Sequence, residues 1–329
     1  MNRNIAVVGC GRWGKDLVRN FAELGTLHTI CDADPKVLNQ FASRYPQANT
    51  ESEYHQVLMN EEIKGIVIAT PSALHYSMAK EALLAGKDTF VEKPFTTKSE
   101  DAQRLVELAE KQQLVLMVGH LLLYHPAVQM LKRYIQSGEL GEIYYLYSTR
   151  VNLGQIRQDE NALWRLVPHD IAMFVYLLEE SPVVVSAYGS SYLQPDFADV
   201  VFVVLRFRTA LAHVHASWLD PHKIRQLTVV GSKRMAVFDD MESEYKLRIY
   251  DKGVISNTLL TKSGQVSCPQ IDLTEPLFLE CQDFIKCMAQ REQPLSNAKR
   301  GLEVVNTLEA AQQSIQREGQ QISIKEVLH

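Results

Sequence analysis

The feature that most restricts the fold is a glycine-rich turn near the start of the chain. An apolar run, Ile5–Val8, leads directly into residues 9–14, which read GCGRWG, and an amphipathic stretch follows. Gly9 permits a tight turn, Gly11 lets a ligand approach the backbone, and Gly14 lets helix and strand pack closely. The free N–H groups at the helix start favour an anion such as a pyrophosphate. The motif therefore predicts a dinucleotide site.

The first 120 residues repeat this alternation of short apolar runs and amphipathic segments. Further strands are expected at 27–31, 65–69, 89–92 and 114–118, and helices at 14–24, 35–45, 73–84 and 98–111. This rhythm is typical of a parallel, doubly wound sheet. Together with the glycine turn it indicates a Rossmann domain over residues 1–120.

The pattern changes to longer runs of β-branched and aromatic residues in the second part, residues 121–329. Strands are expected at 143–152, 183–189, 199–207, 210–218, 226–230 and 247–250, and helices at 126–137, 169–178, 276–290 and 299–316. Few helices separate these strands, so neighbours are expected to pair antiparallel. The predicted fold class is α/β: an N-terminal Rossmann sheet plus a C-terminal α+β domain with a large, mainly antiparallel sheet.

Composition argues against several classes of protein. Hydrophobic residues make up 46% of the chain and charged residues 22%, as in ordinary globular proteins, and a net charge of −5 argues against a nucleic-acid partner. The longest apolar stretch, Leu114–Tyr124, is too short to cross a bilayer, and no signal peptide is expected. The 5 cysteines form no CxxC pair, so a structural zinc site is not expected. We expect a cytoplasmic protein with no metal, no nucleic-acid partner and no membrane partner.

An acidic residue bears on the choice of cofactor. Asp32 directly follows the second predicted strand, where a carboxylate accepts hydrogen bonds from the adenosine ribose. Its charge would repel a 2′-phosphate, which favours NAD over NADP. Arg12 and His28 nevertheless leave NADP possible.

Two further motifs resemble those of a known family. Residues 69–75 read ATPSALH after the third predicted strand, and residues 91–94 read VEKP. With Gly119-His120, Pro168-His169-Asp170 and Ser217-Trp218, this set resembles the Gfo/Idh/MocA oxidoreductases over nearly the whole chain. The resemblance implies that residues 121–329 bind substrate and form homodimers or homotetramers, packing sheet on sheet, with the active site between the domains. Members mostly oxidise or reduce sugar hydroxyls with a nicotinamide cofactor.

The resemblance also implies which residues bind NAD. The turn after the third strand would line the cofactor, and the EKP turn would reach the nicotinamide ribose. Other relatives carry a Trp-Arg pair near the nicotinamide. The implied cofactor-binding residues are Gly9, Gly11, Arg12, Trp13, Gly14, Asp32, Thr70, Pro71, His75, Glu92, Lys93, Trp164 and Arg165.

Oxidation of an alcohol needs a hydride acceptor, which the cofactor supplies, and a base for the hydroxyl proton. Lys93 and His169 are the candidates for this catalytic role. Lysine has a free pKa of about 10.4 and needs burial or a nearby positive charge to lower it. Histidine needs less adjustment. The choice between the two stays open at this point.

One position departs from the pattern of the family. Many relatives carry an aspartate four residues before the active-site histidine, where this chain has Arg165. Arginine stays protonated, so it can contact the cofactor or an anionic substrate group but cannot act as a base. No catalytic aspartate is assigned, and Asp170 is expected to cap the helix that follows.

The segment 147–157 resembles that of relatives acting on nucleotide-linked amino sugars. The predicted reaction is oxidation at C3 of UDP-N-acetylglucosamine, or a close UDP-amino sugar, to a 3-keto sugar in lipid A or surface-glycan biosynthesis. Arginine suits the phosphate oxygens of such a substrate. The predicted substrate-binding residues are Lys93, His120, Tyr124, Arg150, Asn152, Arg157, Asn161 and His169.

Three other interpretations remain open. A UDP-linked glucuronic substrate would use a spare arginine for its carboxylate. A dehydrogenase of free sugar or inositol would not need the nucleotide. The presence of Arg165 is also compatible with a regulator that binds NAD but converts no substrate. The presence of Lys93 and His169, the candidate bases, argues against this interpretation.

Overall fold

The structure, a computed structural model, describes residues 3–154, 160–255 and 259–327. Its internal contacts divide the chain into two compact units. Unit 1 contains residues 1–124 and 275–305, and unit 2 contains residues 125–274 and 306–329. The chain thus leaves unit 1 close to the expected boundary at residue 120, but a later segment returns to it.

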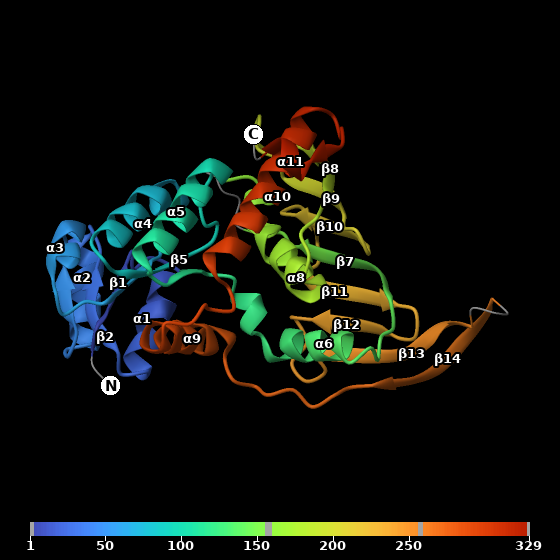
Figure 1. The fold of residues 1–329 in the computed structure, drawn as a ribbon, viewed down its shortest axis with the longest axis horizontal. Helices are drawn as coiled ribbons and strands as arrows, with labels where there is room; N and C mark the ends of the chain where they lie inside the picture. The colour runs from blue at the N-terminus through green and yellow to red at the C-terminus, as the bar shows by residue number, and fades with distance from the viewer. Residues whose placement is uncertain (1–2, 155–159, 256–258, 328–329) are drawn as a thin grey trace. The chain divides into compact units, whose positions relative to one another are not determined.

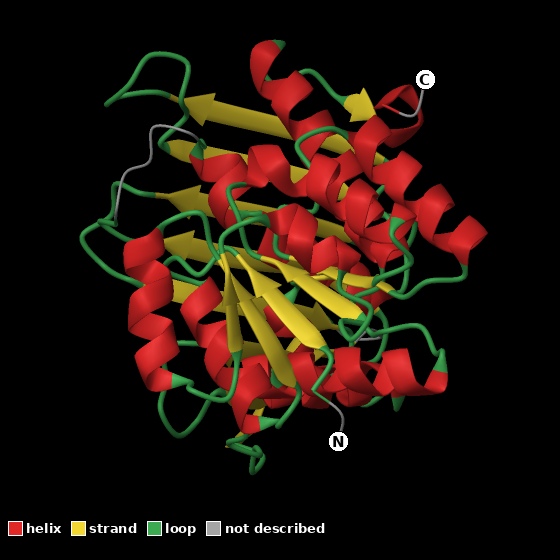
Figure 2. Cartoon of the chain, turned by 90° about the vertical axis from the view of Figure 1, so that its left-hand side faces the viewer, coloured by secondary structure: helices red, strands yellow, loops and turns green. Residues whose placement is uncertain are grey.

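Unit 1 is built on a six-stranded sheet in the order β3-β2-β1-β4-β5-β6, with every neighbouring pair parallel. Its strands are β1 (Ile5–Val8), β2 (Leu27–Cys31), β3 (Asn49–Glu51), β4 (Gly65–Ile68), β5 (Asp88–Val91) and β6 (Leu116–Val118). Its helices are α1 (Gly14–Glu23), α2 (Pro35–Arg44), α3 (Tyr54–Met59), η1 (Ser72–Leu74), α4 (His75–Leu84), α5 (Ser99–Gln112), η2 (Leu121–Tyr124) and α9 (Pro276–Gln290). Helices flank the strands of this sheet (Figure 2). The predicted parallel sheet is confirmed.

Two elements of unit 1 escaped the sequence analysis. The strand β3 has three residues, two of them exposed, and α3 has only six residues. Neither is long enough to show a clear hydrophobic period. By contrast, all four residues of β1 are buried, as expected for a central strand covered on both faces.

The helix α9 belongs to unit 1 because its apolar side packs there. Phe284 meets Phe21 of α1 at a ring distance of 6.5 Å and Phe90 of β5 at 5.7 Å. The sequence analysis placed this segment in the second domain. Helical periodicity marks a buried face but does not say which sheet will cover it.

Unit 2 is built on a nine-stranded sheet in the order β14-β13-β12-β11-β7-β10-β9-β8-β15 (Figure 1). Its strands are β7 (Ile143–Val151), β8 (Val184–Ser190), β9 (Val200–Arg206), β10 (Leu211–Ser217), β11 (Ile224–Gly231), β12 (Met235–Asp239), β13 (Leu247–Ile255), β14 (Leu260–Ser267) and β15 (Ile322–Ser323). Its helices are α6 (Pro126–Gln136), α7 (Ala162–Leu166), α8 (Pro168–Leu178) and α11 (Ile324–Val327), and α10 (Ala298–Gln316) runs from unit 1 into unit 2.

The prediction of a mainly antiparallel sheet is confirmed, with one exception. The strands β7 and β10 pair parallel, with Tyr147 opposite His213. Parallel neighbours need a long connection between them. Here α7, α8, β8 and β9 lie between β7 and β10, which gives the chain enough length for β10 to run in the same direction as β7. The strands β12, β14 and β15 were not predicted.

The two faces of this sheet differ. On one face, α6 packs against β12, and α7 packs against β9 and β10. Along β9 the side chains alternate between buried and exposed, so the other face presents residues such as Phe202 and Val204. None of the helices in the described part of the chain has the length and hydropathy that crossing a bilayer requires.

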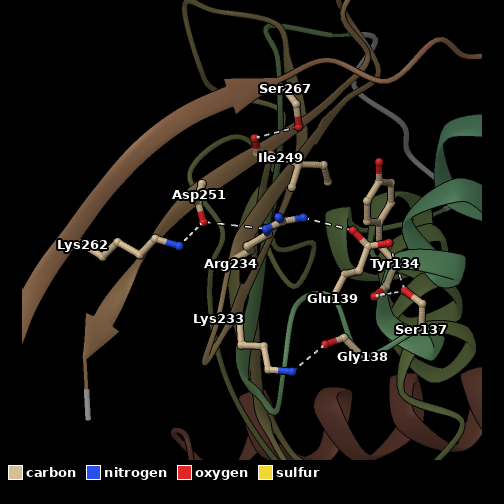
Figure 3. Close-up of polar contacts among 10 residues, drawn as sticks. All are labelled: Tyr134, Ser137, Gly138, Glu139, Lys233, Arg234, Ile249, Asp251, Lys262 and Ser267. Atoms are coloured by element: carbon tan, nitrogen blue, oxygen red, sulfur yellow. Dashed lines mark hydrogen bonds and ion pairs between the residues drawn. The ribbon is translucent and has the colours of Figure 1, made fainter. Parts of the chain in front are cut away.

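A cluster of ion pairs fixes the β13–β14 hairpin at one edge of the sheet (Figure 3). The guanidinium of Arg234 lies between Glu139 Oε2, at 3.0 Å, and Asp251 Oδ1, at 3.7 Å. Lys262 of β14 bonds the same Asp251 at 2.5 Å. These side chains are largely solvent-exposed, so each pair contributes little to stability.

Candidate active site

The glycine turn has the geometry that a dinucleotide requires. Gly9 has φ +86°, and a Cβ there would lie 2.8 Å from the backbone of Ala69 and Thr70. A Cβ at Gly14 would collide with the Gly9 carbonyl, whereas one at Gly11 would meet no atom within 4 Å. Gly9 and Gly14 therefore allow close packing, and the space over Gly11 stays open beside the start of α1. This arrangement fits a bound pyrophosphate.

Asp32 lies at the carboxyl end of β2, beside this turn. Its Oδ2 accepts a hydrogen bond from the Cys10 N–H at 2.6 Å, and its Oδ1 accepts one from the Asp34 N–H at 2.9 Å. Each oxygen has a second lone pair. The carboxylate is thus held in place and can still accept a bond from a ribose hydroxyl, so the residues present fit NAD.

The EKP turn follows β5 and is tied to the glycine turn. The Nε1 of Trp13 donates to Oε1 of Glu92 at 2.5 Å, and the Lys93 N–H donates to Oε2 at 3.1 Å. A Cβ at Gly119 would lie 2.8 Å from the Glu92 carboxyl group. The glycine after β6 therefore makes room for a buried carboxylate that holds Trp13 and Lys93.

His75 links the two turns that were expected to line the cofactor. Its Nδ1 lies 2.7 Å from the Pro94 carbonyl oxygen and its Nε2 lies 2.9 Å from the Thr70 carbonyl oxygen. The side chain is only 1% exposed. His75 therefore acts on the cofactor region chiefly by holding the backbone of Thr70 and Pro94 in place. The exposed Pro71 lies in the turn itself, at the start of η1.

Two predicted substrate ligands of unit 1 are buried. His120 is 1% exposed, and neither ring nitrogen has a hydrogen-bond partner among the described residues. Burial, then the charges of Arg300 and Lys93, lowers the pKa of His120 to about 3, so the ring is neutral. The hydroxyl of Tyr124 donates to Asp283 at 2.8 Å and lies 3.2 Å from the Ser296 hydroxyl. The hydroxyl of Tyr124 thus has two protein partners, and its role as a substrate ligand stays a prediction.

The sequence analysis missed acids that α9 brings to this part of unit 1. Glu280 and Asp283 lie on α9, and burial followed by the charge of Glu92 raises the pKa of Glu280 well above its usual value. Glu280 occupies the apolar stripe of α9 together with Leu277 and Phe284. An acid at a core position of a helix was the signal that could have revealed it.

The predicted substrate arginine of unit 2 has a structural partner. Arg150 donates from Nε to Asp170 Oδ2 at 2.7 Å and from Nη2 to Oδ1 at 3.1 Å. Ser148 donates to the same carboxylate at 2.5 Å, and Asp170 is fully buried. Arg150 is therefore held in a buried ion pair, and its contact with a substrate phosphate stays a prediction. The expected capping role of Asp170 is also wrong, since the side chain makes no cap bond at the start of α8.

Asn161, another predicted substrate ligand, also makes structural contacts. Its Oδ1 accepts from the Trp164 N–H at 3.1 Å and caps α7, and its Nδ2 donates to Gln312 at 2.9 Å. Arg165, on the same short helix, pairs with Glu160 at 3.5 Å. Sequence alone does not distinguish an asparagine that caps a helix from one that binds a ligand, because either can stand just before a helix.

The remaining candidates divide between the two units. The cofactor-binding candidates up to residue 93 lie in unit 1, with Lys93 half-buried, as do His120 and Tyr124. Asn152, Trp164, Arg165 and the half-buried His169 lie in unit 2. The structure thus brings together the glycine turn, Asp32 and the EKP turn. Arg157 lies outside the described residues. Across the described ranges, no three His, Cys, Asp or Glu side chains are grouped so that they could hold a metal ion.

Comparisons with known proteins agree with this architecture. Residues 3–120 match the model of an oxidoreductase family with an NAD-binding Rossmann fold, and residues 128–237 match the Gfo/Idh/MocA C-terminal domain. The chain is 26% identical over 292 residues to the UDP-N-acetylglucosamine 3-dehydrogenase of Acidithiobacillus ferrooxidans, covering 86% of this chain and 88% of that protein. It is 28% identical over 214 residues to inositol 2-dehydrogenase 2 of Saccharopolyspora erythraea, covering 62% of this chain and 63% of that protein.

Solved structures share the fold. The WlbA dehydrogenase of Bordetella pertussis, in complex with NADH and UDP-GlcNAcA, superposes with a TM-score of 0.81 at 22% identity, covering 98% of this chain and 99% of that one. The two matched family domains together span more than half of the chain, and the first carries the glycine turn described above. The chain therefore belongs to the Gfo/Idh/MocA oxidoreductase family, with an NAD-binding Rossmann domain at its N-terminus.

Proposed function

We propose that this protein is an NAD-dependent dehydrogenase that oxidises the 3-hydroxyl of UDP-N-acetylglucosamine, or of a close UDP-amino sugar, to a ketone. The main support for a dehydrogenase is the hydrogen bond between Trp13 and Glu92, which connects the glycine turn to the EKP turn. This bond links the turn suited to the pyrophosphate with Lys93, a group able to handle a proton.

The residues of this chain would divide the work as follows. NAD, held by the glycine turn and Asp32, supplies the acceptor for the substrate hydride. Lys93 or His169 takes the hydroxyl proton, and the Glu92 carboxylate keeps the backbone of Lys93 in place. Lys93 belongs to unit 1 and His169 to unit 2, so each unit contributes one candidate base.

The choice of a UDP-amino sugar rests on two supports. A relative that covers 86% of this chain bears the name UDP-N-acetylglucosamine 3-dehydrogenase, and the segment 147–157 resembles that class of enzyme. Lys93, His120, Asn152, Arg157 and His169 stay the predicted substrate ligands, together with Tyr124, Arg150 and Asn161, which also bond protein partners. The product would enter lipid A or surface-glycan biosynthesis.

The second candidate substrate is a free polyol, because the chain is also similar to an inositol 2-dehydrogenase. An experiment separates the two by following NADH absorbance with NAD and UDP-N-acetylglucosamine, N-acetylglucosamine or inositol. A hydroxylamine trap removes the ketone and draws the reaction forward. NADH that appears only with the UDP-sugar supports the proposal, and NADH with inositol alone replaces it by the polyol reaction. NAD binding by calorimetry without NADH from any of the three would indicate a protein that binds NAD without this turnover.

We also propose that the open face of the unit 2 sheet joins two subunits. Strand pairing places Tyr145, Leu211, Val204, Phe202 and Tyr188 on this one face, and each is at least 40% exposed. Exposed apolar patches of this kind mark protein interfaces.

Size exclusion with light scattering tests this proposal. We expect a multiple of 37.3 kDa for the native protein. The variant Phe202→Asp should dissociate, and Leu84→Asp, an exposed residue of α4 in unit 1, should not. A native mass of one subunit would contradict the proposal.

A further inference from the structure

Glu280 is an acid at a position where a helix normally carries an apolar residue. It lies on α9 in one stripe with Leu277, Cys281 and Phe284, all buried in unit 1. The side chain of Glu280 is 0% exposed. None of the reaction steps described above uses this residue.

The carboxyl group of Glu280 has no polar support. Neither Oε1 nor Oε2 has a hydrogen-bond partner among the described residues. An ionised carboxylate without water, donor or counter-ion is strongly disfavoured in a protein interior. A protonated, neutral carboxyl group avoids most of that penalty.

The charged groups around Glu280 favour the same state. Glu92, after β5, and Asp283, one turn along α9, both act to raise the pKa of Glu280, after burial itself. From η2, the Tyr124 hydroxyl is bonded to Asp283. From α1, Arg19 is bonded to Glu275 at 2.6 Å. The thiol pKa of Cys281 is also raised by burial, so that group is neutral.

Hydrogen-bond donors distinguish Glu92 and Asp283 from Glu280. Glu92 accepts from Trp13 Nε1 and from the Lys93 N–H, and Asp283 accepts from Tyr124 and from the Leu295 N–H at 3.0 Å. Such donors stabilise an anion. When carboxyl groups interact in one buried site, the group that lacks donors holds the proton.

We propose that Glu280 is a positioning residue that stays protonated at working pH, and that its neutrality lets Glu92 remain an anion bonded to Trp13 of the cofactor turn. If Glu280 lost its proton, a second negative charge would act on Glu92, and both residues are buried. Glu92 would then have to move or take up a proton, and either change weakens its bond to Trp13. NAD binding would weaken with it.

Infrared difference spectroscopy of the protein without substrate tests the protonation state directly. The carbonyl band of a protonated carboxyl group is separate from the carboxylate bands. At neutral pH we expect a protonated band in the native protein that is lost in Glu280→Gln and kept in Glu81→Gln, an exposed acid of α4. A band unchanged in Glu280→Gln overturns the proposal. If that variant does not fold, Glu280→Met replaces it, and a native protein with no protonated band at neutral pH overturns the proposal without any variant.

Calorimetry of NAD binding against pH tests the positioning role. Native affinity should fall at alkaline pH as Glu280 ionises. Glu280→Gln should keep its neutral-pH affinity within about threefold over the same range, because a glutamine amide has no proton to lose. An equal alkaline loss in both proteins overturns the role. The importance of Glu92 and Lys93 rests on the proposed function. Both measurements omit the sugar, however, so their results remain valid even if the proposed substrate proves wrong.

Discussion

The indole Nε1 of Trp13 donates a hydrogen bond of 2.5 Å to Oε1 of Glu92. Trp13 follows β1 and Glu92 follows β5, and β4 lies between these two strands in the sheet. One side-chain bond therefore spans a strand and joins the turn that suits the pyrophosphate to the turn that carries Lys93. Bonds to a carboxylate are among the stronger ones in proteins, so this contact can transmit a shift of either turn.

Replacing Trp13 by phenylalanine should weaken NAD binding while the fold remains. The ring is kept, but the bond to Glu92 is lost, and a hydrogen bond to a charged group is worth about 1.5–3 kcal/mol. The bond does not involve NAD itself, so only part of this energy reaches the affinity, and we expect a loss of up to roughly tenfold. Calorimetric titration with NAD measures the change. Glu92→Gln should show a smaller loss, because an amide oxygen still accepts. Unchanged affinity in Trp13→Phe would show that the bond does not matter to the cofactor.

Two substitutions at Asp32 should separate its charge from its structural bonds. Asp32→Asn keeps an oxygen for the Cys10 N–H but removes the negative charge, so the preference for NAD over NADP should relax. Asp32→Ala also frees the turn and should weaken both cofactors. Dissociation constants for NAD and NADP in each variant provide the readout. An unchanged NAD preference in both variants would mean that another residue reads the ribose.

Lys93→Met should abolish turnover and leave NAD binding within about threefold. Methionine keeps the length of the side chain and removes the amine that can exchange a proton, while the bond from the residue 93 N–H to Glu92 remains possible. Initial rates of NADH formation and calorimetry on the same sample report the two properties. Near-native rates would remove Lys93 from the chemistry and leave His169 as the candidate base.

Asp170→Asn should destabilise unit 2 strongly. The buried guanidinium of Arg150 would then lose the carboxylate to which it is bonded, and breaking a buried ion pair typically costs about 3–5 kcal/mol. The more exposed pair of Arg234 and Glu139 offers the control, because Glu139→Gln should cost no more than about 1 kcal/mol. Urea unfolding measures both. Equal effects would show that Arg150 is less enclosed than the structure indicates.

Acid should destabilise the protein partly through His120. Its pKa is about 3 in the folded chain against 6.5 for the free group, so between these values the unfolded chain binds more protons. The stability present above pH 6.5 is therefore lost as the pH falls towards 3, by up to about 1.4 kcal/mol per pH unit. His120→Leu should reduce this slope in urea unfolding, and His222→Leu, at an exposed site, should not. An unchanged slope in His120→Leu would contradict the assignment.

Much of unit 1 and of its cofactor site could be predicted from local sequence. The glycine turn, Asp32 and the EKP turn each follow a buried strand, and the carboxyl ends of parallel strands meet at one edge of a sheet. In unit 2, the sequence did not reveal the polar partners of Arg150 and Asn161, since Asp170 and Gln312 lie 20 and 151 residues away in the chain. Short-range spacing carries no information about such partners.

The sequence by itself determined the alternation of strands and helices, the Rossmann domain and the choice of family. These depend on hydrophobic period and on glycines at turns that other residues cannot adopt. Only the tertiary structure decided that α9 returns to unit 1, that β7 and β10 pair parallel, and that Glu280 is enclosed near Glu92. Burial and charge are properties of assembled neighbours, so a buried acid can be recognised only when the groups that surround it are known.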